Sequence, residues 1–189
     1  ALICIWLVIF VPINLWGVLS TPIENLCFAT MCSLSFVVYS LTTTKAIALD
    51  NLRDPGNLGT IIRTADWFGI NTVFLIGDCV DIYNPKVVQS SMGSFFRVQF
   101  FDITVDDLKD LKVGGYKILG AEMSGEKPES LQQLGTGCLV IGNEANGLSP
   151  AVKKILDSSV FIRRHGKAES LNAAIAAGIL MSAWVNPQN

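Results

Sequence analysis

The sequence predicts an α/β fold, with a parallel sheet and helices on both faces. From Lys45 onward, short apolar runs rich in β-branched residues alternate with segments of helical periodicity. Several runs are continuous enough to be buried on both sides, as in parallel sheets. Strands that alternate with helices imply crossover connections, which cover both faces of the sheet. The expected strands are Ala46–Asp50, Thr72–Gly77, Phe96–Phe101, Tyr116–Glu122, Cys138–Gly142 and Val160–Ile162.

Three segments between or after these strands have helical patterns. In Leu58–Phe68, apolar residues recur at helical spacing, and Gly69 marks the end of the helix. The segment Thr104–Lys112 is amphipathic and acidic and is followed by a pair of glycines. A third helix is expected over Pro150–Leu156, with Ser149 as its N-cap.

The last predicted helix, Leu171–Trp184, is apolar almost all the way round. A helix without a polar face has to be buried, either within one molecule or against a second copy of the chain. We favour the second arrangement, a homodimer, because the last helix of a small domain is most easily covered by a partner.

The composition excludes several classes of function. The net charge is −2, so bulk positive charge does not hold nucleic acid, and any such contact must come from local basic clusters. The five cysteines are scattered without a Cys-x-x-Cys pair, which argues against a disulfide framework and a zinc site. We therefore expect reduced thiols in a cytoplasmic protein. His165 is the single histidine and the single candidate for a histidine base.

Residues 1–44 differ from the rest because Glu24 is their only charged residue. We place a boundary near Lys45, with an apolar leader at 1–44 and the main domain at 45–189. The run Ala1–Leu19 is long enough to cross a bilayer by the usual criterion of about 20 apolar residues. A leader packed on the main domain, or the remainder of an upstream domain, is the preferred interpretation, and a membrane anchor is the second.

Polar side chains gather at three points where an expected strand gives way to a loop or helix. The clusters are Asn57–Arg63, Gly142–Glu144 and Ser170–Asn172. Open α/β sheets place their ligand site at the carboxyl ends of the strands, so we expect the function to lie there.

Glycines accompany the first two clusters. Gly56 and Gly59 would let the backbone approach a ligand closely, and free N–H groups at a helix start favour an anion. Gly142 is interpreted in the same way. The segment around Gly56 and Gly59 lacks the Gly-x-Gly-x-x-Gly pattern of a dinucleotide site and the Gly-Lys-Ser/Thr of a P-loop. This weakens its interpretation as a site for a nucleotide cofactor.

Each cluster also has a purely structural interpretation. Asn57 fits a plain N-cap, and Arg63 fits a surface pair with Asp66 or stacking on Trp67. Glu144 fits a loop charge in solvent, and Ser170 fits the N-cap of the last helix. The run Arg163–Lys167 holds four basic or potentially basic side chains, which suits phosphate but is also typical of a solvated loop.

Taken together, the clusters resemble the motifs of the SpoU-type (TrmH-like) 2′-O-ribose RNA methyltransferases of the SPOUT class. The resemblance covers roughly Lys45 to Trp184, with three motifs in order and at family-like spacing. The matching residues are Asp54, Asn57, Gly59, Arg63 and Ala65 in the first motif, Ile141, Gly142, Asn143, Glu144, Gly147 and Leu148 in the second, and Glu169, Ser170, Leu171, Asn172, Ala176 and Ala177 in the third.

The resemblance implies a C-terminal trefoil knot and a homodimer built partly on the last helix. It implies transfer of a methyl group from S-adenosyl-L-methionine to a ribose 2′-hydroxyl of transfer or ribosomal RNA. The cofactor would lie in the knot near Gly142, Ile162 and Leu171, held largely by backbone contacts. The implied catalytic set is Asn57, Arg63, Glu144, Ser170 and Asn172.

This chain departs from the family pattern in three respects. The residues before the third motif are usually less basic than Arg163, Arg164 and His165, and Asn143 and Asn146 are variants within the second motif. Many members also have an N-terminal RNA-recognition domain, of which we expect residues 1–44 to be at most a remnant.

The resemblance also suggests roles for the catalytic set. A sulfonium donor leaves as a neutral thioether, so the protein must position the reactants and help remove the 2′-hydroxyl proton. The family's proposed base corresponds to Arg63, but a guanidinium ordinarily stays protonated. We therefore expect Arg63 to be a charge clamp, oriented by Glu144 and Asn57. Ser170 and Asn172 would hold the ribose.

Two alternatives stay open. One is a catalytically idle RNA-binding or membrane-associated module that keeps the fold. The other is a base methyltransferase of the same SPOUT class, which fits the third cluster less well.

Overall fold

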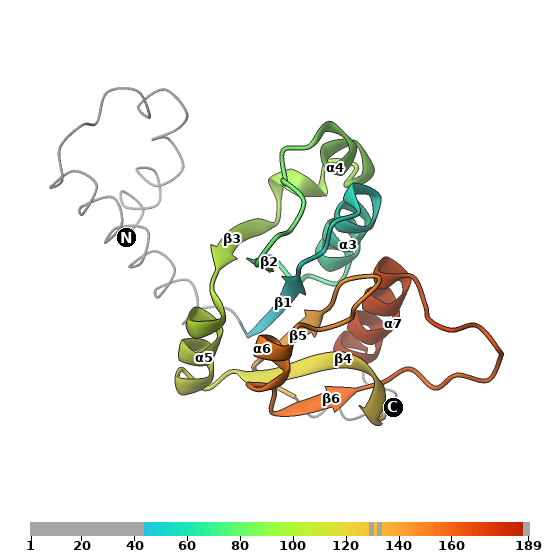
Figure 1. Cartoon of the computed structure of the whole chain (residues 1–189). Helices are drawn as coiled ribbons and strands as arrows, with labels where there is room; N and C mark the ends of the chain where they lie inside the picture. Colours follow the sequence, from blue (N-terminus) through green and yellow to red (C-terminus); the bar gives the residue numbers. More distant parts are fainter. Residues whose placement is uncertain (1–43, 129–130, 132–133, 187–189) are drawn as a thin grey trace, which may run out of the picture. The chain divides into compact units, whose positions relative to one another are not determined.

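A computed structural model of the chain describes residues 44–128, 131 and 134–186. Its centre is a six-stranded sheet with the order β3-β2-β1-β5-β4-β6, in which all neighbouring strands are parallel (Figure 1). The strands are β1 (Lys45–Asp50), β2 (Thr72–Ile76), β3 (Gln99–Ile103), β4 (Lys117–Glu126), β5 (Gly137–Ile141) and β6 (Ser158–Val160). The predicted parallel α/β fold is confirmed.

Helices connect the strands on both sides of the sheet. α3 and α7 contact each other on one side, and α3 also contacts α4, whereas α5 and α6 lie on the other side (Figure 1). The helices in the described residues are α3 (Pro55–Trp67), α4 (Pro85–Ser90), α5 (Val105–Val113), α6 (Pro150–Lys153) and α7 (Ala173–Val185), with a 3₁₀ turn η1 (Ser94–Phe96).

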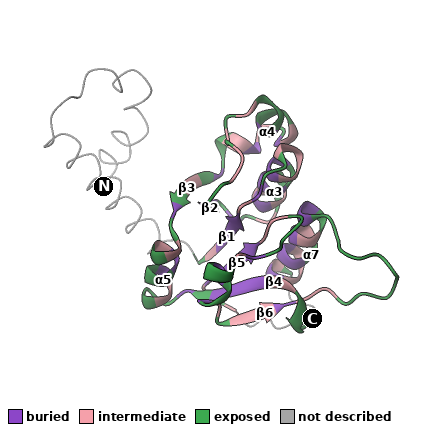
Figure 2. Cartoon of the chain, in the orientation of Figure 1, coloured by how far each residue is buried: buried purple, intermediate pink, exposed green. Residues whose placement is uncertain are grey.

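The central strands are buried on both faces, as their continuous apolar sequences predict. β1 lies between β2 and β5, with Ile47 opposite Val73 on one side and Leu139 on the other. These side chains share a core with apolar residues of α3 and α7. Ala48 and Val140, which point the other way, are also fully buried. Figure 2 shows β1 and β5 coloured as buried along most of their length.

The helix starts follow local capping signals. Ser149 caps α6 as predicted, with its hydroxyl accepting from the Val152 N–H. In α7, however, the N-cap is Asn172, whose Oδ1 accepts from the N–H groups of Ala174 and Ile175. The interpretation of Ser170 as this cap is therefore wrong, and its hydroxyl is not used by the helix.

The region before β3 differs from the prediction. Phe96 belongs to the turn η1, which follows Gly93 in a left-handed conformation (φ 85°), and the strand begins three residues later at Gln99. Phe96, Val98 and Phe100 alternate with polar residues, a pattern typical of a strand, and this alternation begins inside the turn. The short helix α4 was also not predicted, although Asn84 followed by Pro85 is its start signal.

Residues 1–43, which hold nearly all of the proposed leader, lie outside the described residues, and so do the predictions made for them. Within the described part, no helix is long and apolar enough to span a membrane. The trefoil knot stays a prediction. The structure shows that the chain leaves β6 at the edge of the sheet and returns through a long loop to α7 beside α3 (Figure 1).

Candidate functional site

Three side chains, one from each predicted cluster, meet at the carboxyl ends of the central strands. Asn57 lies in the first turn of α3, Glu144 in the loop after β5, and Asn172 at the start of α7. Asn57 Nδ2 donates to Glu144 Oε1 at 3.1 Å, and Asn172 Nδ2 donates to Asn57 Oδ1 at 2.8 Å. The structure thus joins residues 87 and 115 positions apart in one polar chain.

The orientation of both amides in this chain follows from donor and acceptor chemistry. The carboxylate oxygen Glu144 Oε1 accepts, so the Asn57 NH₂ group faces it. The Asn57 oxygen then accepts from the NH₂ group of Asn172, and the Asn172 oxygen caps α7. Each amide therefore has one defined orientation.

Asn57 is available for this role because another residue caps its helix. The N-cap of α3 is Asp54, whose Oδ1 accepts from the Asn57 backbone N–H at 2.7 Å. The interpretation of Asn57 as a plain N-cap is therefore wrong, and its side chain lies half-buried between Glu144 and Asn172.

The loop after β5 is fastened to the end of β1 by a second set of hydrogen bonds. Asn143 Nδ2 donates to the Asn51 carbonyl, and Asn143 Oδ1 accepts from two N–H groups of its own loop. The fully buried Asp50 accepts from the Ser149 N–H at 2.6 Å and from Asn51 Nδ2 at 2.6 Å. Both ends of the loop that carries Glu144 are thereby fixed to the β1–α3 connection.

Two glycines expected to approach a ligand also approach other parts of the protein closely. A Cβ on Gly142 would lie 2.3 Å from the Gly147 carbonyl carbon and 2.5 Å from the Leu148 nitrogen. Gly142 is therefore needed to close its own loop. A Cβ on Gly59 would lie 2.7 Å from the Val87 carbonyl, so this glycine allows α4 to pack against α3.

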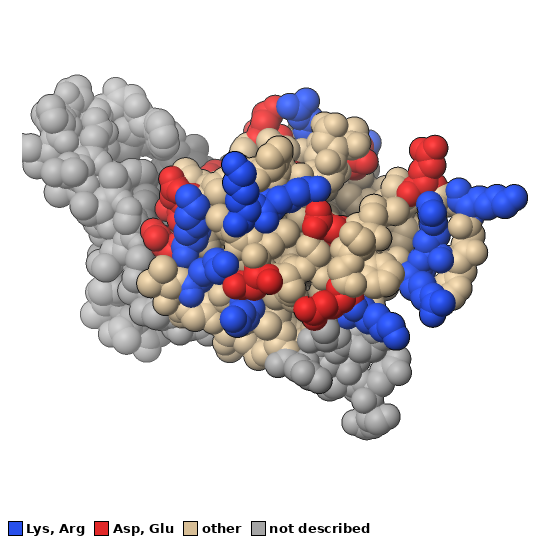
Figure 3. Space-filling model, turned by 60° about the horizontal axis from the view of Figure 1, so that its bottom comes forward, with Lys and Arg blue, Asp and Glu red and all other residues tan. Residues whose placement is uncertain are grey.

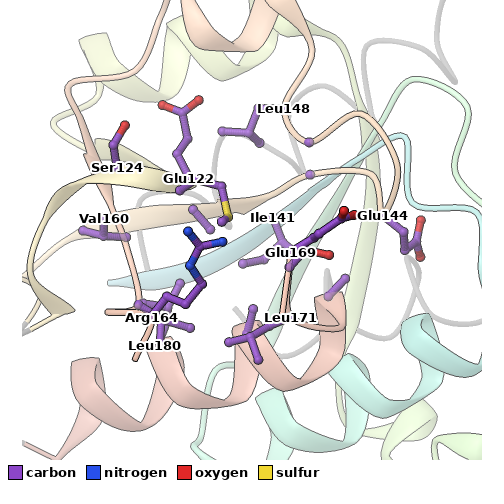
Figure 4. A pocket seen from close by; sticks show the side chains of 18 of the residues that line it. Glu122, Ser124, Ile141, Glu144, Leu148, Val160, Arg164, Glu169, Leu171 and Leu180 are labelled. Atoms are coloured by element: carbon purple, nitrogen blue, oxygen red, sulfur yellow. The ribbon is translucent and has the colours of Figure 1, made fainter. Parts of the chain in front are cut away.

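A cavity of about 800 Å³ opens beside the polar chain (Figure 4). Its wall includes the predicted cofactor residues Gly142, Ile162 and Leu171, together with Glu144 and Ser170. The remaining wall comes from the end of β4, from β6, from α7 and from the loop between β6 and α7. The volume lies within the usual range of about 300–1,000 Å³ for ligand pockets.

One acidic residue of the cavity wall is held ionised. Glu122 on β4 accepts from Lys153 Nζ at 2.8 Å and from Ser159 Oγ at 2.6 Å. These two hydrogen bonds lower the pKa of Glu122 below its ordinary value, against the opposing effect of partial burial. They also connect the end of β4 with α6 and β6.

The structure leaves Arg63 and Ser170 outside the polar chain. Arg63 lies six residues after Asn57, which turns its side chain through about 240° relative to Asn57, and it is exposed. Within the described residues neither Arg63 nor Ser170 has a side-chain hydrogen bond or ion pair, and Asn57 and Glu144 contact each other rather than Arg63. The alternative pair of Arg63 with Asp66 is not formed, because Asp66 binds Arg97.

Several residues that build the site were not singled out from the sequence. Asp50 and Asn51 fix the loop, and Glu122 lies in the cavity wall. An acidic residue at the end of an otherwise apolar strand was an available signal for Asp50, because a buried carboxylate requires donors. Asn51 has a left-handed backbone (φ 55°), which favours asparagine at a tight turn.

Comparisons with known proteins cover nearly all of the domain that the structure describes. The model of the SpoU rRNA Methylase family matches residues 44–182. The 23S rRNA (guanosine(2553)-2′-O)-methyltransferase RlmP of Bacillus subtilis is 36% identical over 142 residues, which are 74% of this chain and 57% of that protein. The chain therefore spans little more than half the length of this relative.

Solved structures show the same similarity. A putative RNA methyltransferase of the TrmH family from Porphyromonas gingivalis aligns with a TM-score of 0.69 and 40% identity, covering 75% of this chain and 59% of that one. The SpoU methyltransferase AviRb from Streptomyces viridochromogenes, in complex with the cofactor AdoMet, aligns with a TM-score of 0.68 and 32% identity, covering 74% of this chain and 58% of that one.

The fold and the site thus define a parallel α/β domain with a ligand cavity at the carboxyl ends of its strands. The chain belongs to the SpoU rRNA methylase family. The resemblance inferred from the three motifs is confirmed, with nearly the same boundaries.

Proposed function

We propose that the chain transfers a methyl group from S-adenosyl-L-methionine to a ribose 2′-hydroxyl of transfer or ribosomal RNA. The observation that carries this proposal is the chain of hydrogen bonds Glu144–Asn57–Asn172 beside a nucleoside-sized cavity. Named relatives in the same family methylate 23S ribosomal RNA at ribose 2′-oxygens.

The cavity has the features that this cofactor requires. It combines apolar wall residues such as Ile141, Leu148 and Leu180 with backbone of the loop that starts at Gly142. Apolar walls suit an adenine ring, and backbone N–H and C=O groups suit its polar edge. When bound there, S-adenosylmethionine would supply an electrophilic methyl group.

We assign the remaining tasks to the chain's own polar groups. Ser170, which lies in the cavity wall, and Asn172, two residues later, are suited to hold the ribose and the adjacent backbone. The exposed Arg63 is suited to bind a phosphate or the developing alkoxide, because a guanidinium stays protonated and offers several donors. Glu144 and Asn57 hold Asn172 in place, since they contact it through the polar chain rather than contacting Arg63.

We also propose that the chain forms a homodimer through α7. One face of this helix, with Ala177, Leu180 and Trp184, is buried in the described residues. On another face, Ile175 and Ile179 lie one turn apart with exposures of 56% and 42%. Paired exposed isoleucines on a helix are typical of a contact surface.

A cytoplasmic location is part of the same proposal. Cys79 and Cys138 are free thiols, and burial raises the pKa of both above the ordinary value of a cysteine. Such thiols suit a reducing compartment, in which transfer and ribosomal RNA of bacteria are also found.

The direct test is to incubate the full chain with methyl-labelled S-adenosylmethionine and total RNA, and then to digest the RNA to nucleosides. We expect the label in 2′-O-methylated nucleosides. Label in a methylated base would favour the alternative base methyltransferase, and no incorporation would favour an idle RNA-binding module. Mapping ribose methylation in cells with and without the protein would then identify the modified nucleotide.

A further inference from the structure

The loop between β6 and α7 concentrates positive charge on a chain whose net charge is negative. Positions 163–167 hold Arg163, Arg164, His165 and Lys167, whereas the whole chain has a net charge of −2. All of these side chains are exposed, and the loop projects from the body of the domain (Figure 1). Lys and Arg side chains gather at the corresponding right-hand edge of the surface in Figure 3.

The charges in this loop are not used to stabilise the fold. The five ion pairs in the described residues involve Arg53, Arg97, Lys109, Lys112 and Lys153, and none of them involves the loop. The one hydrogen bond recorded for its basic side chains runs from Arg164 Nη1 to the Ala168 carbonyl at 3.2 Å. The guanidinium of Arg164 points into the cavity (Figure 4).

Arg163, which lies in the cavity wall beside Arg164, and Lys167, which lies outside that wall, are therefore free to meet a ligand. They lie in the same loop as Ser170, three to seven residues before it, and this loop forms part of the cavity wall. A ribose presented to Ser170 and Asn172 carries a phosphate on each side. The negative charge of those phosphates matches the unpaired cations of the loop.

We propose that Arg163 and Lys167 bind RNA phosphates that flank the methylated ribose, and that this loop supplies backbone affinity without reading sequence. This inference rests on the proposed function and adds a substrate-holding surface to it. A solvated loop of the same composition would make no such contact, and the two possibilities differ in how RNA binding depends on salt.

The test compares the full chain with the double variant Arg163→Gln/Lys167→Gln. Arg164 is left unchanged because its guanidinium points into the cavity and already donates to the Ala168 carbonyl. Binding of a short fluorescein-labelled single-stranded RNA is measured by anisotropy between about 50 and 200 mM salt. Each lost phosphate contact on a single strand should reduce the steepness of the plot of log binding constant against log salt concentration by about 0.7. The slope for the double variant should therefore be shallower by about 1.4. Its RNA affinity at low salt should fall about tenfold or more.

A charge-matched control is Lys109→Gln/Lys154→Gln, which removes two exposed positive charges on α5 and after α6. This control should keep the slope of the unmodified chain and should bind S-adenosylhomocysteine as the unmodified chain does. If the unmodified chain methylates RNA and the loop variant has the slope of the control, the loop proposal is overturned alone. If the unmodified chain neither binds nor methylates RNA, the proposed function is overturned together with it.

Discussion

Asn57 and Asn172 are joined by a 2.8 Å hydrogen bond across 115 positions of sequence. The bond ties the first turn of α3 to the first turn of α7, because the oxygen of Asn172 already caps α7. Leu171, the neighbour of Asn172, lies in the cavity wall. The hydrogen bond therefore determines where α7 and the adjoining cavity wall begin relative to α3.

Replacing Asn57 tests this relationship. In Asn57→Asp, the group facing Glu144 changes from a donor to a carboxylate, so two negative charges would lie about 3 Å apart. We expect the rate of methyl transfer to fall about 10- to 100-fold, which corresponds to an activation free energy higher by roughly 1.4–2.7 kcal/mol. The measurement is kcat with saturating cofactor. Thermal unfolding of the same variant checks that the loss does not come from unfolding.

The double-mutant cycle of Asn57→Ala and Asn172→Ala gives an independent measurement. Directly bonded residues should show a coupling energy of about 0.5–3 kcal/mol in activity. Strict additivity of the two substitutions would contradict a shared role.

Replacing Arg63 tests its role as a charge clamp. Arg63→Ala should abolish methyl transfer, because no other side chain replaces a guanidinium at that position, while the affinity for S-adenosylhomocysteine stays within about twofold. Isothermal titration with S-adenosylhomocysteine and a single-turnover methylation assay separate these two quantities. A large loss of cofactor affinity would contradict this division of labour.

The matched control removes another arginine, on a nearby surface. Arg97 binds Asp66 of α3 through a partly exposed ion pair. Arg97→Ala should cost about 1 kcal/mol of stability or less and leave turnover unchanged.

The architecture could be predicted from the sequence because it depends on local patterns. Apolar runs such as Ala46–Asp50 are continuous, and the stripe that contains Leu58 and Ile62 has helical spacing, so strand and helix follow from neighbours alone. The alternation of Phe96, Val98 and Phe100 with polar residues predicts a strand, yet Phe96 lies in the turn η1 and the strand begins at Gln99.

The assembly of the site could be predicted only in part. The three clusters were found because each follows a strand, and parallel strands end at the same edge of the sheet. The hydrogen bonds of Asn57 depend on partners 87 and 115 positions away, and a local pattern assigns the same residue to a helix cap. The role of Asp50 likewise depends on Ser149, 99 positions later.

Gly142→Ala should reduce cofactor affinity through the backbone. A Cβ at Gly142 would meet the Gly147 and Leu148 backbone at 2.3 and 2.5 Å, so the loop has to move. We expect a loss of about 1–3 kcal/mol in stability and a fall of about tenfold or more in affinity for S-adenosylhomocysteine. Gly135→Ala is the control, because nothing lies within 4 Å of its added methyl group. Equal affinities for the two variants would show that the loop does not shape the cavity.

Glu122 should make stability depend on pH in the acidic range. Lys153 and Ser159 lower the pKa of Glu122 in the folded state. The ionised side chain therefore stabilises the fold at pH values above the pKa of the unfolded chain, which is near the ordinary 4.5. That contribution is lost as the pH falls through the lowered folded value. Glu122→Gln should therefore reduce stability at neutral pH by up to about 1 kcal/mol, and the two denaturation midpoints should converge below pH 4.5. A difference that persists undiminished in acid would point to lost packing rather than lost charge.

The exposed face of α7 gives the last prediction. Ile175 and Ile179 are 56% and 42% exposed and lie on one face of the helix, so a dimer through α7 would bury both. The double substitution Ile175→Glu/Ile179→Glu places charges in that contact, and light scattering with size-exclusion chromatography should then give the mass of one chain. Val113→Glu on α5, where the side chain is 89% exposed, is the control and should keep the dimer mass. If both variants stay dimeric, another surface holds the subunits together. If the unmodified chain is itself a monomer, the proposal of a dimer is wrong.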